Sequence, residues 1–389
     1  MLNFKYSIPT KIFFGKGQIQ VLGKEIKKYG SKVLLAYGGG SIKKIGVYDE
    51  VVKILKEENI PFWELSGIAP NPRIESVREG IRICRENNID FILPVGGGST
   101  IDCAKVIAAG FFYKGDPWDL VIKKAKIEKV LPIASVLTLA ATGSEMDTGA
   151  VITNPETKQK IGVAHPDMAP KFSILDPTYT FSVSANQTAA GIADIMSHTL
   201  ETYFSNNRDA FVQDKIAEGL LKTCIKYGPI AIKEPDNYEA RANLMWASSL
   251  AINGLIRYGK EVIWSVHPLQ HELGAYYDIT HGVGLAILTP HWMRHVLDDK
   301  TVDKFVEYGK NVWDIKEDKY DYDIANEAID KTYEFFKSLG IPMTLREIGI
   351  GEENLEKMAK AVTDYNGGTV GSFKPLSYED VLQIYKAAL

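Results

Sequence analysis

The 389-residue sequence contains only three cysteines, and no two of them form a CxxC pair. Thiols this few and this scattered exclude a disulfide framework and a thiolate zinc site. We expect all three to be buried structural residues: Cys84, Cys103 and Cys224.

The chain also lacks an excess of basic residues, because 45 Lys and Arg stand against 49 Asp and Glu and give a net charge of -4. Without a stripe rich in Lys and Arg, nucleic acid is not an expected partner. No apolar run approaches the roughly 20 residues that cross a bilayer, and the first residues lack the order of a signal peptide. We therefore expect a cytoplasmic protein with no membrane partner.

Hydrophobic residues make up 45% of the chain, which is enough for two domains. From Lys32 to Asp176, short apolar β-type runs alternate with amphipathic helical stretches, a pattern typical of a parallel sheet covered by helices. Beyond Pro177, long helical periodicities dominate. We predict an α/β, Rossmann-like N-terminal domain over residues 1–183, an all-α C-terminal domain over residues 184–389, and a cleft between them.

Two local features stand apart from this alternation. The residues from Ala150 to Ala164 predict a hairpin, with its turn at Asn154, Pro155 and Glu156. The segment from Tyr6 to Phe14 also reads as extended. It is either an edge strand that pairs with another chain or an ordinary packing strand.

Two strand-like runs each lead into a glycine turn and the start of a helix. Val33 to Tyr37 precedes Gly38-Gly39-Gly40-Ser41, and Phe91 to Val95 precedes Gly96-Gly97-Gly98-Ser99. Glycines let the backbone approach an anion, and a helix N-terminus offers unpaired N–H groups to a pyrophosphate. Neither turn matches GxGxxG, so each could also be a tight structural turn. Two such turns together favour a dinucleotide site.

Other residues near these turns could have either a ligand-binding or a structural role. Small residues and hydroxyls from Thr138 to Glu145 could lie against a ribose or a ring, or could make a close helix contact. The Ser99 hydroxyl could cap its helix or bind phosphate. Asp102, expected on the first turn of that helix, could accept from a carboxamide or cap the helix itself.

A second group of residues has the chemistry of metal ligands. Asp194 and His198 are four residues apart on a predicted helix, so they share one face. Downstream, His267, His271 and His281 account for three of the chain's seven histidines. Imidazoles with one carboxylate suit Zn²⁺ or Fe²⁺, although any one histidine is more often a hydrogen-bonded core or surface residue.

Several long motifs follow one another in an order that resembles the iron-containing, or group III, alcohol dehydrogenase family. The resemblance is to its branch of NADPH-dependent, butanol-dehydrogenase-like aldehyde reductases and runs nearly end to end. The motifs are GGGSTIDCAK from Gly96, AATGSE from Ala140, ILDPTYT from Ile174, QTAAGIADIMSHTLE from Gln187 and HPLQHELGAYYDITHG from His267.

The resemblance implies a divalent metal, Fe²⁺ or Zn²⁺, bound by Asp194, His198, His267 and His281, with His271 near the substrate as a candidate for proton transfer. Water or the cofactor ribose could carry the proton instead. The resemblance also implies a set of cofactor contacts: Gly38, Gly39, Ser41, Gly97, Gly98, Ser99, Asp102, Thr138, Thr142, Thr148, Lys160 and Tyr179.

These parts predict hydride transfer between a nicotinamide cofactor and a small aldehyde or alcohol, and the resemblance implies a primary alcohol of the butanol type. We predict NADP(H), because no acid stands between Tyr37 and Asp49 to repel a 2′-phosphate, whereas Lys43 and Lys44 lie just beyond the turn. The resemblance further implies a homodimer, with residues 6–14 at the contact.

Two alternatives differ in function. A dehydroquinate-synthase-like lyase, which binds NAD and zinc, would need a cluster of Lys and Arg around a phosphorylated substrate. The segment from Asn253 to His281 offers only Arg257 and Lys260. A regulatory protein that binds nucleotide and metal without turnover is the other alternative.

Overall fold

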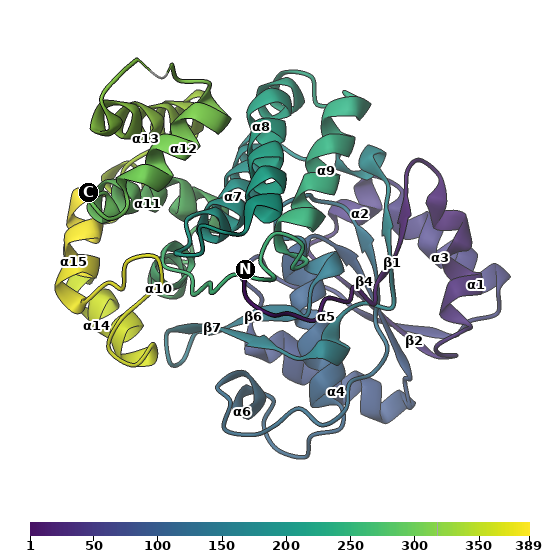
Figure 1. Ribbon diagram of the computed structural model, residues 1–389. Coiled ribbons are helices and arrows are strands. Elements are labelled where there is room, and N and C mark those ends of the chain that lie inside the picture. Colours follow the sequence, from purple (N-terminus) through teal and green to yellow (C-terminus); the bar gives the residue numbers. More distant parts are fainter. Residues whose placement is uncertain (317) are drawn as a thin grey trace. The chain divides into compact units, whose positions relative to one another are not determined.

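A computed structural model describes residues 1–316 and 318–389 (Figure 1). The contacts divide the chain into two compact units. The sheet unit comprises Ser7–Val183 and Pro235–Ser249, and the helical unit comprises Met1–Tyr6, Ser184–Glu234 and Leu250–Leu389. These units are not contiguous in sequence, unlike the predicted ranges 1–183 and 184–389, because residues 1–6 pack with the helical unit and residues 235–249 with the sheet unit.

The sheet unit is built on six strands in the order β1-β8-β5-β4-β2-β3, and every neighbouring pair is parallel. Parallel strands place their carboxyl ends at one edge of the sheet, where ligands of such folds bind. The strands are β1 (Lys11–Phe14), β2 (Val33–Tyr37), β3 (Phe62–Leu65), β4 (Phe91–Gly96), β5 (Ala134–Leu137) and β8 (Phe172–Leu175).

Both faces of this sheet are buried, which explains its continuous apolar strands. Alternate residues point to opposite faces. Leu35 of β2 packs in the core beneath α1 and α3, while Leu34 packs in the core beneath α4 and α5. Cys84 and Cys103 belong to the second core, and Cys224 is buried in the helical unit, as predicted. The covering helices are α1 (Leu22–Ile26), α3 (Val47–Glu57), α4 (Ile74–Asn87) and α5 (Gly98–Gly110).

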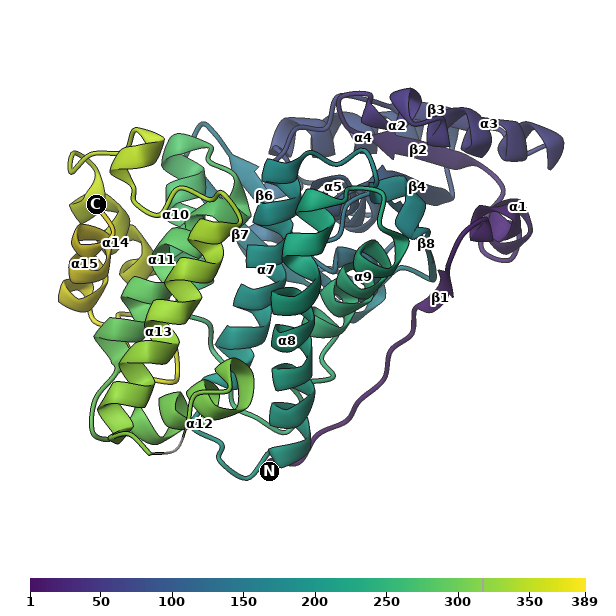
Figure 2. The same ribbon diagram turned by 90° about the horizontal axis from the view of Figure 1, so that it is seen from above.

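The predicted hairpin is confirmed, with β6 antiparallel to β7 and residues 155–158 as its turn. The extended segment is shorter than predicted, since only β1 forms a ladder and residues 1–10 trace a path without helix or strand (Figure 2). β1 does lie at an edge of the sheet. The remaining elements here are α2 (Ser41–Lys44), α6 (Trp118–Val121), β6 (Gly149–Asn154), β7 (Gln159–Ala164) and α9 (Tyr238–Ile252), which ends in the helical unit.

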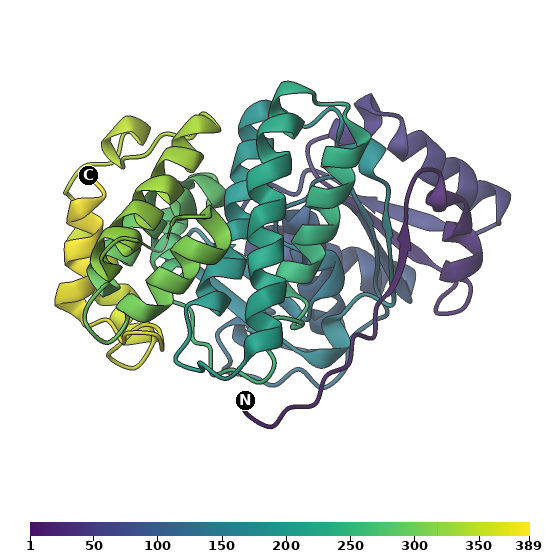
Figure 3. The same ribbon diagram turned by 45° about the horizontal axis from the view of Figure 1, so that its top comes forward.

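The helical unit confirms the predicted α-helical C-terminal part. Its long helices α7 and α8 lie side by side (Figures 2 and 3). α7 begins after Ser184, whose hydroxyl accepts a hydrogen bond from the backbone N–H of Gln187 at 3.3 Å. The helices are α7 (Ala185–Tyr203), α8 (Phe211–Lys233), α10 (Val266–Tyr277), α11 (His281–Val296), α12 (Val302–Trp313), α13 (Asp321–Ser338), α14 (Leu355–Tyr365) and α15 (Tyr378–Ala387).

A buried charge network stabilises this unit. Lys260 and Lys304 each donate to one oxygen of Asp214, with 2.7 Å from Lys304 Nζ to Oδ2. All three side chains are at most 4% exposed, so the carboxylate compensates two ammonium groups away from water. Among the described residues, no helix is long and apolar enough to cross a membrane.

Candidate metal centre and cofactor turns

Three helices of the helical unit bring the predicted ligands together. Asp194 and His198 lie one turn apart on α7, and their side chains are 3% and 4% exposed. His267 is the second residue of α10, and His281 is the first residue of α11. The ligands therefore come from the interior of one helix and from the beginnings of two others.

One oxygen of Asp194 lies close to all three rings. Asp194 Oδ1 is 3.5 Å from Nε2 of His198. The same oxygen is 3.8 Å from Nε2 of His267 and 3.6 Å from Nε2 of His281. Ligand atoms bound at about 2 Å to one tetrahedral ion stand at similar separations from one another.

The donor chemistry of this cluster fits a divalent ion. Donor atoms of Asp194, His267 and His281 all lie within 4.8 Å of one another. Nε2 of His267 is buried and makes no hydrogen bond, so an ion would satisfy a polar atom that the protein leaves unsatisfied. Three imidazoles and one carboxylate suit Fe²⁺ or Zn²⁺.

The environment also keeps an imidazole available as a ligand. Burial lowers the pKa of His198 to about 4, so this ring is neutral at pH 7 and can offer a lone pair. Burial acts in the same direction on His267, but the carboxylates of Asp194 and Glu201 outweigh it, and the pKa of His267 is raised.

His271 lies one turn after His267 on α10 and is half-buried. Its ring centroid is 5.8 Å from that of His281 and 6.4 Å from that of His267. The structure thus places it beside the cluster but outside the group of donor atoms that lie within 4.8 Å of one another. His198 is also outside that group, but its Nε2 lies 3.5 Å from Asp194 Oδ1.

Two residues that the sequence argument did not single out support the rings. Glu201 Oε1 accepts from Nδ1 of His267 at 2.6 Å, and Gln270 Oε1 is hydrogen-bonded to Nδ1 of His281. Spacing could have indicated Glu201, which lies seven residues after Asp194 and so on the same face of α7.

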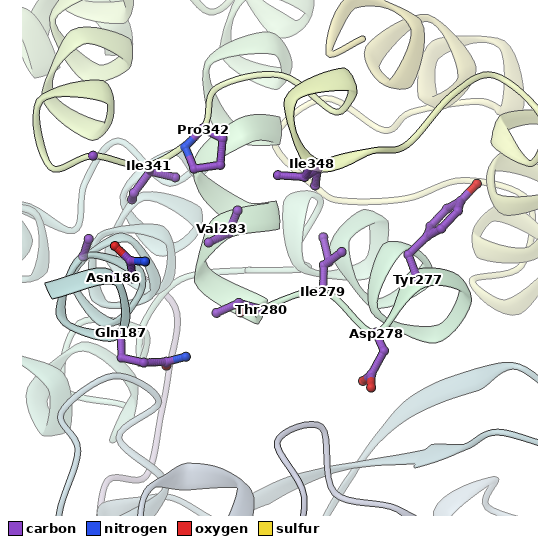
Figure 4. A pocket seen from close by; sticks show the side chains of 12 residues that line it. Asn186, Gln187, Tyr277, Asp278, Ile279, Thr280, Val283, Ile341, Pro342 and Ile348 are labelled. Atoms are coloured by element: carbon purple, nitrogen blue, oxygen red, sulfur yellow. The ribbon is translucent and has the colours of Figure 1, made fainter. Parts of the chain in front are cut away.

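A pocket of about 420 Å³ lies elsewhere in the helical unit (Figure 4). Asn186 and Gln187 line it from the first turn of α7, and Ile341 and Pro342 line it from the segment after α13. Thr280, the residue before His281, contributes to its wall, but none of the candidate ligands does.

In the sheet unit, the two glycine turns follow neighbouring strands. β2 and β4 pair in parallel, with Tyr37 beside Val95, so both turns leave the same edge of the sheet. Gly40 has a φ of 101°, which favours glycine. A Cβ on Gly98 would lie 2.1 Å from Oγ1 of Thr142, so the backbone at the start of α5 is closely approached.

Each glycine turn leads into the start of a helix, as predicted, but the two helices differ in length. α2 has only four residues, so the first turn leads into a short helix, whereas α5 has thirteen. The N-cap of α5 is Gly97, without a side-chain cap, so Ser99 does not cap the helix.

The prediction for Asp102 is also corrected. It is the fifth residue of α5, in the second turn, because the helix begins at Gly98. It does not cap its own helix: its oxygens accept from Ser144 Oγ at 2.6 Å and from the backbone N–H of Val151 at 2.8 Å. Burial raises its pKa to about 6.

Thr138 follows β5, and its N–H donates to Gly96 of β4 at 3.0 Å, which places it beside the second glycine turn. Nearby, Glu145 is fully buried, and its Oε1 accepts from Ser249 Oγ at 2.5 Å. Burial raises the pKa of Glu145 to about 7.

Three other predicted cofactor residues make contacts of their own within the protein. Thr148 accepts at its carbonyl from the N–H of His165 at 3.2 Å. Lys160 on β7 donates to Asn71 at 2.7 Å. Tyr179, beyond β8, donates to Glu50 of α3 at 3.1 Å.

Known proteins match this chain over nearly their whole lengths, in sequence or in structure. NADH-dependent butanol dehydrogenase A of Clostridium acetobutylicum is 66% identical, covering 99% of both chains. The NADPH-dependent aldehyde reductase YqhD of Escherichia coli is 39% identical, covering all of both chains. The crystal structure of NADH-dependent butanol dehydrogenase A from Thermotoga maritima matches with a TM-score of 0.95 at 42% identity, over 99% of this chain and 98% of that one.

Two family models match most of the sequence. The model described as iron-containing alcohol dehydrogenase matches residues 9–177, and the model of the C-terminal part of the Fe-containing alcohol dehydrogenase family matches residues 188–389. None of these relatives supports the alternative lyase. The chain therefore belongs to the iron-containing alcohol dehydrogenase family.

Proposed function

We propose that this alcohol dehydrogenase interconverts small aldehydes and primary alcohols of the butanol type, with a nicotinamide cofactor and a divalent metal, Fe²⁺ or Zn²⁺. The observation that carries the proposal is the approach of one Asp194 oxygen to three imidazole nitrogens at 3.5 to 3.8 Å. Relatives at 66% and 39% identity are named as a butanol dehydrogenase and an aldehyde reductase, which agrees with this substrate class.

Asp194, His198, His267 and His281 would hold the ion. A divalent ion there would act as a Lewis acid on the carbonyl oxygen while nicotinamide C4 supplies the hydride. His271, half-buried and 5.8 Å from the ring of His281, would deliver the proton to the new alcohol oxygen through Nδ1 or Nε2.

The two glycine turns would hold the cofactor in the sheet unit. Gly38, Gly39 and Ser41 follow β2, and Gly97, Gly98 and Ser99 follow β4. The thirteen-residue α5 presents its first N–H groups beside the second turn, as a pyrophosphate requires. Around them, Asp102, Thr138, Thr142, Thr148, Lys160 and Tyr179 are the proposed further contacts.

For the cofactor we propose NADH, in place of the NADP(H) preference that the sequence predicts. The prediction rested on the absence of an acid after β2, but Glu64 on the adjacent strand β3 accepts hydrogen bonds from Tyr37 at 2.5 Å and Tyr48 at 2.7 Å. Lys43 lies over both tyrosine rings, at 5.1 and 4.5 Å. Glu64 also interacts electrostatically with Lys43 and so partly offsets its charge. Relatives at 66% and 62% identity are named as NADH-dependent.

The test is kcat/KM for butanal reduction with each cofactor on protein reloaded with Fe²⁺ or Zn²⁺. We expect a higher value with NADH, and a higher value with NADPH would restore the original prediction. Gly39→Asp should lower kcat/KM for NADPH more than for NADH, because the new carboxylate repels the 2′-phosphate. At a partly exposed site this repulsion costs about 1 to 4 kcal/mol of binding free energy. A Cβ on Gly39 meets nothing within 4 Å, so the first atom of a side chain has room there. Gly39→Asn is the matched neutral control.

We also propose a homodimer that uses the open edge of β1. The N–H groups of Lys11 and Gly15 bond to the β8 side, so by alternation that of Ile12 points to the open edge. Ile12→Pro would remove this outward donor without breaking the β1–β8 ladder. We expect the sedimentation mass to fall to that of one chain, with unchanged circular dichroism. A variant that stays dimeric would refute the edge contact.

A further inference from the structure

Glu201, near the end of α7, is bound at the start of another helix. Its side chain is 2% exposed, and its oxygens accept from the backbone N–H groups of Ser265, Val266 at 3.0 Å and His267 at 2.8 Å. Ser265 is the N-cap residue of α10 but makes no side-chain cap of its own. A carboxylate from α7 therefore satisfies the unpaired N–H groups and the positive end of α10.

The same carboxylate also fixes a side chain. Glu201 Oε1 accepts from Nδ1–H of His267 at 2.6 Å, so the lone pair of that ring lies on Nε2. That nitrogen is 3.8 Å from Asp194 Oδ1. Glu201 thus holds both the backbone and the ring of His267, which leaves the residue little freedom to turn away from Asp194.

His281 is supported in a different way. Its Nδ1 is hydrogen-bonded to Oε1 of Gln270, a neutral amide with no exposed surface. Of these two rings, the one on α10 has a charged partner and the one on α11 a neutral partner. A carboxylate partner makes an imidazole a stronger ligand than an amide does, since it stabilises positive charge on the ring.

We propose that Glu201 is the positioning residue of the metal centre: by binding the start of α10 and Nδ1 of His267 together, it presets this ligand before an ion arrives. The inference rests on the proposed metal function. It adds that α7 supplies two ligands and also the support of a third, from positions 194, 198 and 201 on one face.

A helix cap alone would have a different consequence. A cap that only stabilises α10 would change the stability of the metal-free protein and leave the intrinsic affinity for the ion unchanged. A positioning residue changes that affinity, typically by 10- to 100-fold for a partner of a ligating histidine. Metal binding and unfolding must therefore be measured side by side.

The experiment uses full-length protein stripped of metal, with the wild type, Glu201→Gln, Glu201→Asp and a matched control, Glu218→Gln. Glu218 is also buried, at 6% exposure, and accepts from Tyr203 at 3.1 Å and Asn311 at 2.9 Å, but it supports no candidate ligand. Zn²⁺ affinity is measured by competition with a chromophoric chelator, ligand geometry by the visible absorption of Co²⁺, and stability by urea unfolding without metal.

We expect Glu201→Gln to weaken Zn²⁺ binding by about 10- to 100-fold and to alter the Co²⁺ spectrum. Glu201→Asp, which keeps the charge on a shorter side chain, should lie between this variant and the wild type and keeps the test open if Glu201→Gln does not fold. Glu218→Gln should change the affinity by less than about 2-fold even where its stability falls, because it leaves the ligands in place.

Wild-type affinity and an unchanged spectrum in folded Glu201→Gln and Glu201→Asp would overturn the inference and leave the proposed function standing. Failure of the wild type to bind Zn²⁺ or Co²⁺ would overturn the proposed metal function, and the inference with it.

Discussion

Gly282 lies beside His281 at the start of α11, where this helix crosses α7. A Cβ at this position would stand 1.9 Å from the carbonyl oxygen of Ala190 and 2.6 Å from its carbon. Both atoms belong to the backbone of α7, so no side-chain rotation can relieve the overlap. Gly282→Ala should therefore separate the first turn of α11 from the helix that carries Asp194.

The size of the effect follows from the overlap. An ordinary contact begins near 3.4 Å, so α11 must move by roughly 1.5 Å at this point. Metal–ligand distances lie within about 0.2 Å of their usual values, so a shift of this size would take His281 Nε2, now 3.6 Å from Asp194 Oδ1, out of ligand position. Overpacking of this kind costs about 1 to 3 kcal/mol. If that strain is released by displacing His281, Zn²⁺ affinity falls by about 10- to 100-fold.

The assay compares chelator competition and urea unfolding for Gly282→Ala and for Gly219→Ala. Gly219 is exposed on α8, and a Cβ there meets nothing within 4 Å, so alanine should raise stability by about 0.5 to 1 kcal/mol without changing metal binding. A Gly282→Ala protein with wild-type Zn²⁺ affinity and stability would refute the reasoning. It would show that the close approach of α11 to α7 does not depend on this glycine.

Four further variants test other parts of the structure. His281→Ala should lose metal and activity together with its fold intact by circular dichroism, whereas His271→Ala should retain metal and show a lower rate or a shifted pH profile; equal metal loss in both would exclude the ligand set proposed above. Asp214→Asn should cost about 3 to 5 kcal/mol in urea unfolding, because two buried ammonium groups lose their carboxylate, and a loss below about 1 kcal/mol would contradict this. Burial raises the pKa of Glu145 to about 7 from 4.5, so the folded protein keeps a proton that the unfolded chain releases between those pH values, and stability is lost as pH rises through this window. Glu145→Gln should therefore gain stability relative to the wild type from pH 5 to pH 8, and a difference that does not change with pH would speak against a protonated carboxyl.

Local order was readable from the sequence wherever it depends on neighbours along the chain. The apolar runs at Val33–Tyr37 and Phe91–Val95 form strands because a parallel sheet buries both faces. Asp194 and His198 share one face of α7 because residues four apart in a helix lie on the same side. The family motifs likewise identified the iron-containing alcohol dehydrogenase family, whose two models match residues 9–177 and 188–389.

Contacts between distant segments were decided only by the tertiary structure. Glu64 lies beside Tyr37 because β3 pairs with β2, so an acid absent from the turn in sequence is present beside it in space. Asp102 does not cap its own helix but accepts a hydrogen bond from Ser144, 42 residues further along the chain. Glu201 reaches His267 across 66 residues. Hydrogen-bond partners of this kind follow from how helices and strands pack, and neither propensity nor periodicity carries that information.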